Sequence, residues 1–588
     1  MYRTHLLNSM TEKDVGKDVV LSGWVHRRRD HGGIIFMDLR DRYGMTQIVS
    51  DPEKFKEAHD VLNESRSEFV LRIEGTVGKR PDGQENSNLE TGKIEVLVKK
   101  AEILSSSEVP PFEIDQDKDL PEDLRLKFRY LDLRRQRMKN NIIKRSEVIK
   151  FIRDFLEKED FLEIETPILI KGTPEGSREY IVPSRLHEGD FYVLPQSPQQ
   201  LKQLLMVGGF DKYFQIARCF RDEDQRGDRQ PEFTQLDLEM SFIEMEDIID
   251  LNERLLKDLV KMFKPEKKVT DFVTLTYEEA MNLYGSDKPD LRFELPLSDI
   301  SDIASECDFG VFKNTVEGGG VVKALNVSGG GEFPRSYVDS LEAIVKEQGA
   351  KGLAYMYLED DGSFKSPISK FFKDDELKAI AERCGAKKGD LILFAADKWI
   401  KCCEFLGLLR LKIAEKLELM DENVFAFCWV TEFPLFEYDE DGGKLNAVHH
   451  PFTAPIKEHL ELLDKEPEKV LSDAYDVVLN GCEVGGGSIR IHDQGLQAKI
   501  FKTLGISDED AESRFGHILK AFGYGVPPHG GIAWGLDRLI MIFQNEPNIR
   551  EVIPFPKDQQ ARDLMLGAPS EVPMETLNEV HIKANIKK

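Results

Sequence analysis

The sequence is poor in cysteine, and its cysteines follow no pairing pattern. The 588 residues include seven cysteines, and none of them forms a Cys-x-x-Cys pair. This odd count excludes a disulfide scaffold and a zinc finger, and it favours a reducing compartment. No run approaches the roughly 18 apolar residues of a membrane span, and the segment after Met1 lacks the apolar stretch of a secretory signal. We therefore expect a cytoplasmic protein that binds neither zinc nor a membrane.

The common nucleotide and metalloprotease motifs are also missing, and basic residues are in deficit. The chain contains no Walker P-loop, no HExxH and no convincing GxGxxG. Its 80 Lys and Arg residues against 107 Asp and Glu give a net charge of −27. This charge argues against a DNA-binding coat, because the protein would repel phosphate. Two local basic clusters, residues 27–29 and 125–145, still allow contact with a polyanion.

The length predicts several domains in a multidomain α+β chain. Residues 1–108 show the period-two alternation of a small antiparallel β-barrel, and the oligonucleotide-binding (OB) fold is one candidate. An acidic, proline-containing stretch at 109–135 is typical of a linker. Mixed helix and strand patterns then fill the rest of the chain. We expect a core domain from 136–287 and 421–556, an α/β insertion at 288–420, and a C-terminal extension at 557–588.

Two segments combine charged residues with elements that suit phosphate binding. Arg221 and Glu223 are two apart on a predicted strand, where they would share one face; arginine can clamp a phosphate and glutamate can accept from an exocyclic amine. A surface hairpin with ion pairs is the plainer interpretation. Gly535 and Arg538 open an apolar helix, a place that suits a phosphate site, although this signal is weak alone.

A third segment predicts a pair of carboxylates. Asn480-Gly481 between apolar runs is a strong hairpin signal. A two-residue turn places Val478 opposite Glu483, with Asp476 diagonal to Glu483 on the same face. Two such carboxylates can bind a Mg²⁺ ion that also contacts a triphosphate. The alternative interpretation is that both acids face solvent on an edge hairpin.

Together these motifs resemble the signatures of class II aminoacyl-tRNA synthetases, namely the Arg-x-Glu strand–loop–strand and the Gly-x-x-Arg helix. Within that class the whole chain is similar to bacterial-type aspartyl-tRNA synthetases. Residues 161–167 resemble the family's first motif, which builds its dimer interface, although Asp160 stands where glycine is usual. Further matching runs are Gly172-Thr173-Pro174-Glu175-Gly176, Gln196-Ser197-Pro198-Gln199, His449-His450-Pro451-Phe452-Thr453 and Gly486-Gly487-Ser488-Ile489-Arg490.

The resemblance implies an OB-fold anticodon-binding domain, a class II antiparallel-sheet catalytic domain, a bacterial insertion and a homodimer. The implied reaction is two-step: aspartate attacks the α-phosphate of ATP, and the aspartyl-adenylate then acylates tRNA. Such chemistry needs positioning and charge neutralisation rather than a covalent group. The implied catalytic residues are Arg221 and Arg538, and Mg²⁺ is assigned to Asp476 and Glu483. The residues implied to bind ATP are Arg221, Asp222, Glu223, Gln230, Phe233, Glu483, Gly535, Leu536, Asp537 and Arg538.

The aspartate pocket implied by the resemblance is built around fixed cations. Lys202 and Arg490 match the family's readers of the substrate carboxylate, with Asp237 holding Lys202. Asparagine would leave these two cations without a counter-charge, which predicts its rejection. The full set implied to bind aspartate is Glu175, Ser197, Gln199, Lys202, Arg221, Asp237, His449 and Arg490.

The barrel residues that match the family's anticodon contacts are Arg29, Phe36 and Gln47. From strand alternation alone Phe36 would more often pack under a loop than stack on a base, and the resemblance favours the base. His31 and Gly83 match the positions linked to a relaxed tRNA choice. We therefore expect aspartylation of both aspartate and asparagine tRNA. A strict aspartyl-tRNA synthetase, an asparaginyl-tRNA synthetase and a non-catalytic tRNA-binding paralogue are the alternatives.

Overall fold

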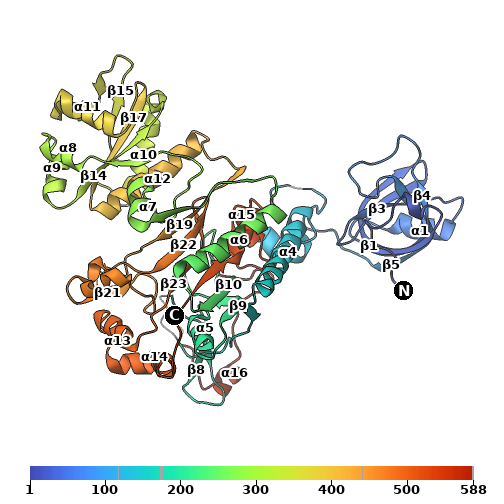
Figure 1. The fold of residues 1–588 in the computed structure, drawn as a ribbon. Helices are drawn as coiled ribbons and strands as arrows, with labels where there is room; N and C mark the ends of the chain where they lie inside the picture. Colours follow the sequence, from blue (N-terminus) through green and yellow to red (C-terminus); the bar gives the residue numbers. More distant parts are fainter. Residues whose placement is uncertain (117, 173–176, 440–441, 586–588) are drawn as a thin grey trace. The chain divides into compact units, whose positions relative to one another are not determined.

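The computed structural model describes residues 1–116, 118–172, 177–439 and 442–585 (Figure 1). The chain forms two compact units, one of residues 1–145 with 550–570 and the other of residues 146–549 with 571–588. Every helix in the described residues is too short or too polar to cross a membrane.

The first unit is built around a closed five-stranded barrel with the strand order β1-β2-β3-β5-β4. Its strands are β1 (Asp18–His31), β2 (Ile34–Arg40), β3 (Met45–Ser50), β4 (Val70–Lys79) and β5 (Ile94–Ser105), with helix α1 (Lys56–Glu64) between β3 and β4. β3 and β5 pair in parallel and the other neighbours are antiparallel. Ile35, Met37 and Leu39 are at most 1% exposed, which confirms the alternation predicted for β2.

Part of the basic cluster at 125–145 is used inside this unit. It begins in the short helices α2 (Glu122–Lys127) and α3 (Arg129–Asp132). Arg125 forms an ion pair with Glu551 at 2.6 Å, and the buried Arg129 pairs with Asp132 at the same distance. These charges are balanced by protein carboxylates, so the two arginines contribute little to a polyanion surface.

The second unit contains an eight-stranded mixed sheet with the order β12-β19-β22-β23-β24-β10-β9-β6. Its strands are β6 (Leu162–Glu163), β9 (Lys212–Phe220), β10 (Glu232–Ser241), β12 (Val273–Thr276), β19 (Phe427–Thr431), β22 (Ala474–Leu479), β23 (Cys482–Ile489) and β24 (His529–Gly535). Three short pairs are β7 (Ile181–Pro183) with β8 (Phe191–Val193), β11 (Lys268–Val269) with β18 (Val424–Phe425), and β20 (Phe436–Asp439) with β21 (Lys444–Ala447). The central strands β22 to β9 are antiparallel, as the resemblance implies.

Helices pack on this sheet and around its edges, as Figure 1 shows for α6 and α15. They are α4 (Gln136–Lys158), α5 (Gln199–Val207), α6 (Met245–Phe263), α7 (Tyr277–Tyr284), α13 (Gln494–Thr503), α14 (Asp508–Phe522), α15 (Leu536–Phe543) and α16 (Met574–Glu579). The end of α4 explains how Asp160 replaces the usual glycine. Asp160 has φ +67°, and the amide of Phe161 donates to the carbonyl of Leu156 at 3.0 Å. The left-handed helix cap is therefore kept, because aspartate tolerates this conformation better than most residues.

The segment predicted as an insertion contains a separate five-stranded sheet in the order β13-β14-β17-β15-β16. The strands are β13 (Leu297–Asp299), β14 (Val321–Val327), β15 (Ala354–Leu358), β16 (Phe364–Lys365) and β17 (Asp390–Asp397). The helices are α8 (Ser301–Glu306), α9 (Gly310–Glu317), α10 (Arg335–Glu347), α11 (Asp374–Arg383) and α12 (Trp399–Lys416). α12 contacts both α7 and β14, so it joins this sheet to the main one.

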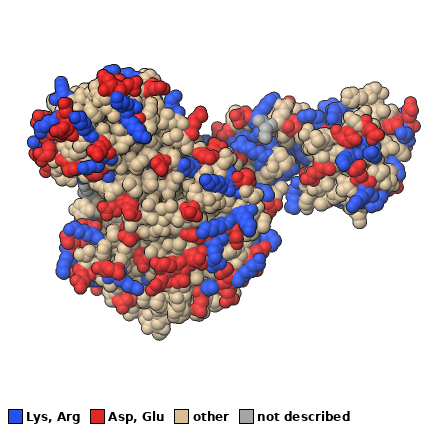
Figure 2. All heavy atoms as spheres, turned by 45° about the horizontal axis from the view of Figure 1, so that its top comes forward, with Lys and Arg blue, Asp and Glu red and all other residues tan. Residues whose placement is uncertain are grey.

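Acidic and basic side chains are interspersed on the face of the molecule shown in Figure 2. The net charge of −27 is therefore not spread over this face as a uniform acidic coat. Local basic sites can still attract phosphate, because exposed charges beyond about 10 Å are screened at moderate salt.

Candidate active site

Arg221 and Glu223 follow strand β9 in the loop that leads to β10. The sequence predicted that both residues lie on a strand, and this prediction was wrong. The amide of Asp222 donates to the carbonyl of Arg178 at 3.0 Å instead of to β10, so the ladder stops there. The Arg221 guanidinium lies over the ring of Phe233 on β10, 5.2 Å from its centroid. The strand pair therefore holds a cation and an aromatic face side by side.

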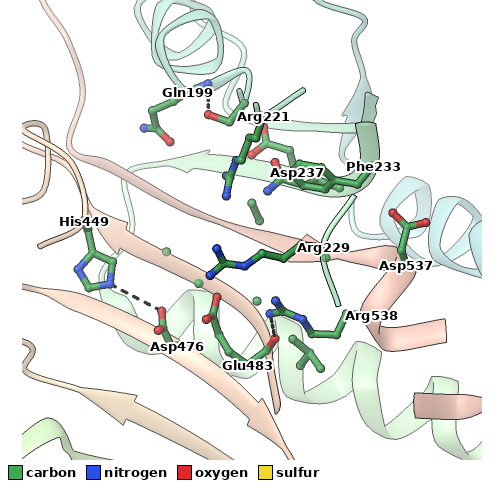
Figure 3. Close-up of a pocket in the computed structure, with 18 of the residues that line it drawn as sticks. Gln199, Arg221, Arg229, Phe233, Asp237, His449, Asp476, Glu483, Asp537 and Arg538 are labelled. Carbon is green, nitrogen blue, oxygen red and sulfur yellow. Dashed lines mark hydrogen bonds and ion pairs between the residues drawn. The ribbon is translucent and has the colours of Figure 1, made fainter. Parts of the chain in front are cut away.

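Loop residues pair with the motif side chains. Arg229 Nη1 lies 3.4 Å from Glu223 Oε2, and the hydroxyl of Ser177 donates to the other oxygen of Glu223. Arg538 is the third residue of α15, and its Nη2 donates to Asp228 Oδ2 at 3.0 Å. Figure 3 shows the Arg229 side chain extending into the cavity above Glu483. A bound phosphate would replace these carboxylates as the partner of the arginines.

The predicted hairpin is confirmed. Asn480 and Gly481 have φ values of +50° and +80°, and they form a two-residue turn between β22 and β23. This is the conformation that the Asn-Gly pair favours in a tight hairpin. Val478 pairs with Glu483, as the sequence predicted.

Asp476 and Glu483 converge on one face of the hairpin. The register shifts after Val477, and Asp476 therefore faces Gly486. A Cβ atom added to Gly486 would lie 2.5 Å from Asp476 Oδ1 and 3.8 Å from Glu483 Oε1. The two carboxylates thus lie above the same glycine, which leaves room for them because it has no side chain.

The proximity of the two acids perturbs Glu483. The charge of Asp476 and burial raise the pKa of Glu483, while the cations Arg538 and Lys288 oppose this rise. Two carboxylates that repel one another, with oxygen as the donor atom, fit a hard cation such as Mg²⁺. Within the described residues, no group of three or more His, Cys, Asp or Glu side chains is arranged as a metal site. The pair would therefore supply only two ligands.

Four charged side chains are buried together beside this hairpin. Lys202 on α5 lies 2.5 Å from Asp237 Oδ1 and 3.2 Å from Glu239 Oε2, both on β10. Arg490, just after β23, donates from Nε to Glu239 Oε1 at 2.9 Å. All four are at most 2% exposed, because β10 is covered on both faces. Two cations and two carboxylates thus form a neutral cluster.

This neutrality corrects one step of the sequence argument. Lys202 and Arg490 are not uncompensated cations, because Glu239 and Asp237 pair with them. Burial raises the pKa of Glu239, but Arg490 and Lys202 outweigh burial and hold it at about 2. Burial also raises the pKa of Asp237, and Lys202 opposes this rise. The substrate carboxylate must therefore compete with internal ion pairs.

Arg490 Nη2 also donates to Glu239 Oε2 at 3.2 Å, whereas its Nη1 has neutral partners. Its Nη1 donates to Ser488 Oγ at 2.6 Å and to His450 Nε2 at 2.7 Å. Burial, followed by the charge of Arg490, lowers the pKa of His450 well below its ordinary value. His450 is consequently a neutral acceptor. His449 also lines the cavity, with Nε2 3.9 Å from Asp476 Oδ1 (Figure 3).

Most of the predicted residues line one cavity of about 450 Å³. Those that do are Ser197, Gln199, Lys202, Arg221, Glu223, Gln230, Phe233, Asp237, His449, Asp476, Glu483, Arg490, Gly535, Asp537 and Arg538. Asp222 and Leu536 do not line it, and Leu536 is fully buried in the core. Asp537 sits at its margin, where it accepts from the amide of Thr234 at 2.8 Å (Figure 3). Glu175 lies outside the described residues.

The predicted anticodon residues of strands β1, β2 and β3 lie together on the barrel. Arg29 pairs with Phe36 across β1 and β2, and Arg29 Nη2 lies 3.2 Å from Gln47 Oε1. Phe36 is half-buried, and the exposed His31 meets its ring edge-on with centroids 5.9 Å apart. Gly83 lies in the β4–β5 loop with φ +82°. An aromatic ring next to a cation and an amide is a suitable surface for an unpaired base.

Comparison with known proteins decides the family. Residues 121–559 match the model of the class II tRNA synthetases (D, K and N), and residues 19–104 match that of the OB-fold nucleic acid binding domain. The chain belongs to the class II tRNA synthetases. Members of this class use ATP, so the synthetase has an ATP site, and the cavity contains the class motifs.

Relatives of this synthetase match it along its whole length. The Aspartate--tRNA(Asp/Asn) ligase of Desulfatibacillum aliphaticivorans is 52% identical over 99% of this chain and 98% of its own. The Aspartate--tRNA ligase of Macrococcus caseolyticus is 51% identical over 100% of this chain and 99% of its own. The aspartyl-tRNA synthetase structure from Entamoeba histolytica is 20% identical, with a TM-score of 0.56 over 94% of this chain and 91% of that one, and it supports the fold.

Sequence reasoning missed several residues that line the synthetase's cavity or pair with the side chains that do. Glu239 follows Asp237 by two positions on β10, so the period of a strand could have revealed that both face Lys202. Asp228 and Arg229 lie in the loop between β9 and β10, and no sequence pattern predicts which side chains of a loop point into a cavity. His450 was quoted within a motif without a role, and its contact with Arg490 is visible only in three dimensions.

Proposed function

We propose that this synthetase attaches L-aspartate to tRNA through an aspartyl-adenylate, on both aspartate tRNA and asparagine tRNA. The observation that carries the proposal is that Lys202, Asp237 and Arg490 of the buried cluster line the same cavity as Arg221 and Arg538, with Glu239 paired to Lys202 and Arg490. An amino-acid pocket with fixed charges thus adjoins the class motifs for ATP. The full-length relative named Aspartate--tRNA(Asp/Asn) ligase supports the same substrates.

The ATP side of the proposal assigns a task to each motif residue. Phe233 stacks under the adenine, and Arg221 neutralises the charge that develops on the α-phosphate. Glu223 accepts from the adenine amine, with Gln230 contributing a further polar contact. Arg538 exchanges Asp228 for the terminal phosphate. Each of these residues acts by binding and orienting, and none acts as a covalent nucleophile.

Arg490 gives a physical reason for choosing aspartate over asparagine. Its Nη1 group faces Ser488 and His450, which are neutral acceptors. A substrate carboxylate that replaces them turns hydrogen bonds between a cation and neutral acceptors into hydrogen-bonded ion pairs, which adds attraction between opposite charges. The amide of asparagine would only exchange one neutral acceptor for another. Ser197 and Gln199 complete the pocket around the α-amino group, with Glu175 assigned there from the resemblance, and His449 closes it.

The proposal includes Mg²⁺, held by Asp476 and Glu483 together with the phosphates of ATP. The ion would neutralise phosphate charge, while the two side chains fix its position on the hairpin. It also includes a homodimer through the motif that begins at Phe161. Leu162, Ile168 and Leu169 are each 46% or more exposed in the isolated chain, which supports a partner surface there.

The residues proposed to bind tRNA lie on the barrel. Arg29, Phe36 and Gln47 are proposed to bind the anticodon, and His31 and Gly83 to admit either tRNA. The seven cysteines are all free, in keeping with a cytoplasmic enzyme. A strict aspartate–tRNA ligase is the main alternative, and it differs from the proposal only at this surface.

The test is aspartylation of purified aspartate tRNA and asparagine tRNA side by side at matched salt. Comparable charging of both would support the full proposal, whereas charging of aspartate tRNA alone would overturn its relaxed part. Absence of both charging and aspartate-dependent ATP–pyrophosphate exchange would overturn the enzymatic proposal and favour a tRNA-binding paralogue.

A further inference from the structure

The stretch that enters the insertion passes beside the hairpin that carries Asp476 and Glu483. This root segment, residues 286–295, runs between α7 and β13. A Cβ atom added to Gly481 would lie 3.1 Å from the Cβ of Asp290, tighter than an ordinary contact. A larger residue at position 481 would be disfavoured both by this contact and by the backbone φ of +80°. The hairpin turn and the root segment thus pack directly against one another.

Asp290 is a fixed point in this contact. It is 2% exposed, and its carboxylate accepts from Arg292 Nε at 3.0 Å and Arg292 Nη2 at 2.6 Å. It also accepts from the backbone amide of Arg292 at 3.1 Å. The side chain that touches the turn therefore has little freedom to move.

Arg410 of α12 ties this segment to the insertion. It is 1% exposed, and its Nη2 donates to the carbonyls of Asp290, Phe293 and Glu294 at 2.9, 2.8 and 3.0 Å. Its Nε donates to the carbonyl of Leu295 at 3.2 Å, and its guanidinium lies 4.1 Å from the centroid of the Phe293 ring. One buried guanidinium thus holds four carbonyls of a single stretch, a task that suits the planar donor fork of arginine.

The opposite side of the turn is held as well. Asn480 Oδ1 accepts from the amide of Ala426 at 2.8 Å, and its Nδ2 donates to the carbonyl of Val424 at 2.9 Å. The turn is therefore clamped between the segment that enters the insertion and the strand that follows it. Glu483 lies only two residues beyond Gly481, so a displacement of the turn moves its carboxylate relative to Asp476.

We propose that Arg410 is a positioning residue for the Asp476–Glu483 pair, so that the insertion sets the geometry of the site for the phosphates of ATP. Arg410 fixes the root segment, Asp290 of that segment fixes the turn, and the turn fixes the separation of the two carboxylates. The inference rests on the proposed function of this pair. It gives the insertion a role in the first half of the reaction, with no contact between Arg410 and substrate.

The test compares Arg410→Met and Arg410→Lys with Lys323→Met in the full-length protein. Lys323 is an equally buried cation of the insertion, and its Nζ donates to Asn282 Oδ1 on α7 at 2.8 Å. It therefore reports a general loosening at the junction. The first readout is hydrogen–deuterium exchange of residues 476–484, which needs neither ATP nor activity. The second is ATP–pyrophosphate exchange, with separate KM values for ATP and aspartate.

Arg410→Met should speed hydrogen exchange in residues 476–484 and raise the KM for ATP by roughly 3- to 10-fold, with the KM for aspartate nearly unchanged. Arg410→Lys should recover part of the protection, since lysine keeps the charge without the fork. Lys323→Met should leave residues 476–484 as protected as in the wild type. If Arg410→Met does not fold, Gly481→Ala displaces the turn at its other end and should raise the KM for ATP selectively.

Unchanged hydrogen exchange in residues 476–484 of folded Arg410→Met would overturn the inference, as would an equal effect of Lys323→Met. Glu483→Gln separates this failure from that of the proposed function. If Glu483→Gln activates aspartate as well as the wild type does, the role of the carboxylate pair is wrong, whatever the hydrogen exchange of Arg410→Met shows.

Discussion

Arg490 Nε lies 2.9 Å from Glu239 Oε1, and both side chains are at most 2% exposed. An arginine expected to read the substrate carboxylate is thus already paired with an internal one. Such a pair costs desolvation, but it fixes the arginine in one orientation before the substrate arrives. Selectivity then depends on the donors that Glu239 leaves available rather than on an excess of positive charge.

Glu239→Gln should destabilise the protein strongly. Glutamine keeps the shape but leaves Lys202 and Arg490 with only Asp237 as a counter-charge, at an expected cost of about 3–5 kcal/mol. Thermal unfolding of the variant should show a lower midpoint temperature. Saturating aspartate should raise this midpoint by more than it raises that of the wild type, because the ligand supplies the missing charge. Glu159→Gln, which breaks the exposed pair with Arg254, is the control and should cost at most about 1 kcal/mol.

Asp476→Asn should increase the requirement for magnesium. The substitution removes one of two charged oxygen ligands and relieves the repulsion that raises the pKa of Glu483. The Mg²⁺ concentration that gives half-maximal ATP–pyrophosphate exchange should rise on the order of tenfold. Asp473→Asn, three residues earlier in the chain, should leave this concentration unchanged. An equal shift in both variants would contradict the assignment of the ion to Asp476.

Asp473 should make the stability of the fold depend on pH. Burial, followed by the charge of Glu246, raises the pKa of this carboxyl to about 6 from an ordinary value of 3.8. Between pH 4 and 6 the folded state therefore binds more protons than the unfolded chain, so stability falls as the pH rises through this window. Asp473→Asn should remove this fall in stability between pH 4 and 6, and it should stabilise the protein at pH 8 by up to about 3 kcal/mol. Denaturant midpoints at pH 4.5 and pH 8 would measure this, and parallel pH profiles for both proteins would disprove it.

The sequence was most informative where a local pattern dictates a local geometry. Strand alternation predicted the inward set of β2, and Asn480-Gly481 predicted the turn because few other pairs favour its positive φ values. The register shift after Val477, which turns Asp476 over Gly486, has no such signature. Glu239 and His450 were missed because their roles come from contacts with Arg490, which lies far along the chain. Local sequence signals predict helices, strands and turns, whereas contacts between side chains of different elements can be identified only from the three-dimensional structure.

Phe36→Ala should weaken tRNA binding without affecting amino-acid activation. A stacked base is worth about 1–3 kcal/mol, so the KM for tRNA should rise roughly tenfold. ATP–pyrophosphate exchange, which needs no tRNA, should be unchanged. Tyr43→Ala is the control, since Tyr43 is an exposed aromatic of the same domain whose ring lies under Arg42. An equal rise in KM for both variants would show that Phe36 has no special contact with the anticodon.

His31→Leu should narrow the choice of tRNA. His31 ends β1, and its imidazole meets the edge of the Phe36 ring while remaining exposed to a ligand. An imidazole can donate to one base and accept from another, because either ring nitrogen can carry the proton. Leucine keeps the apolar contact with Phe36 but can do neither. The kcat/KM for asparagine tRNA should therefore fall about tenfold relative to that for aspartate tRNA, in line with the loss of one base contact.

The ratio of the two kcat/KM values is the measurement that decides this prediction, because it cancels any general effect on folding or activation. His59→Leu on α1 is the control. It removes an imidazole of the same domain, one that forms a hydrogen bond with Ser50. If His31→Leu lowers both kcat/KM values equally, His31 contributes to affinity but not to choice. Discrimination would then have to come from the β4–β5 loop, where Gly83 has a φ of +82° that a larger residue would resist. Gly83→Ala would be expected to change the ratio in that case, because it alters the loop while leaving the Arg29–Phe36 surface intact.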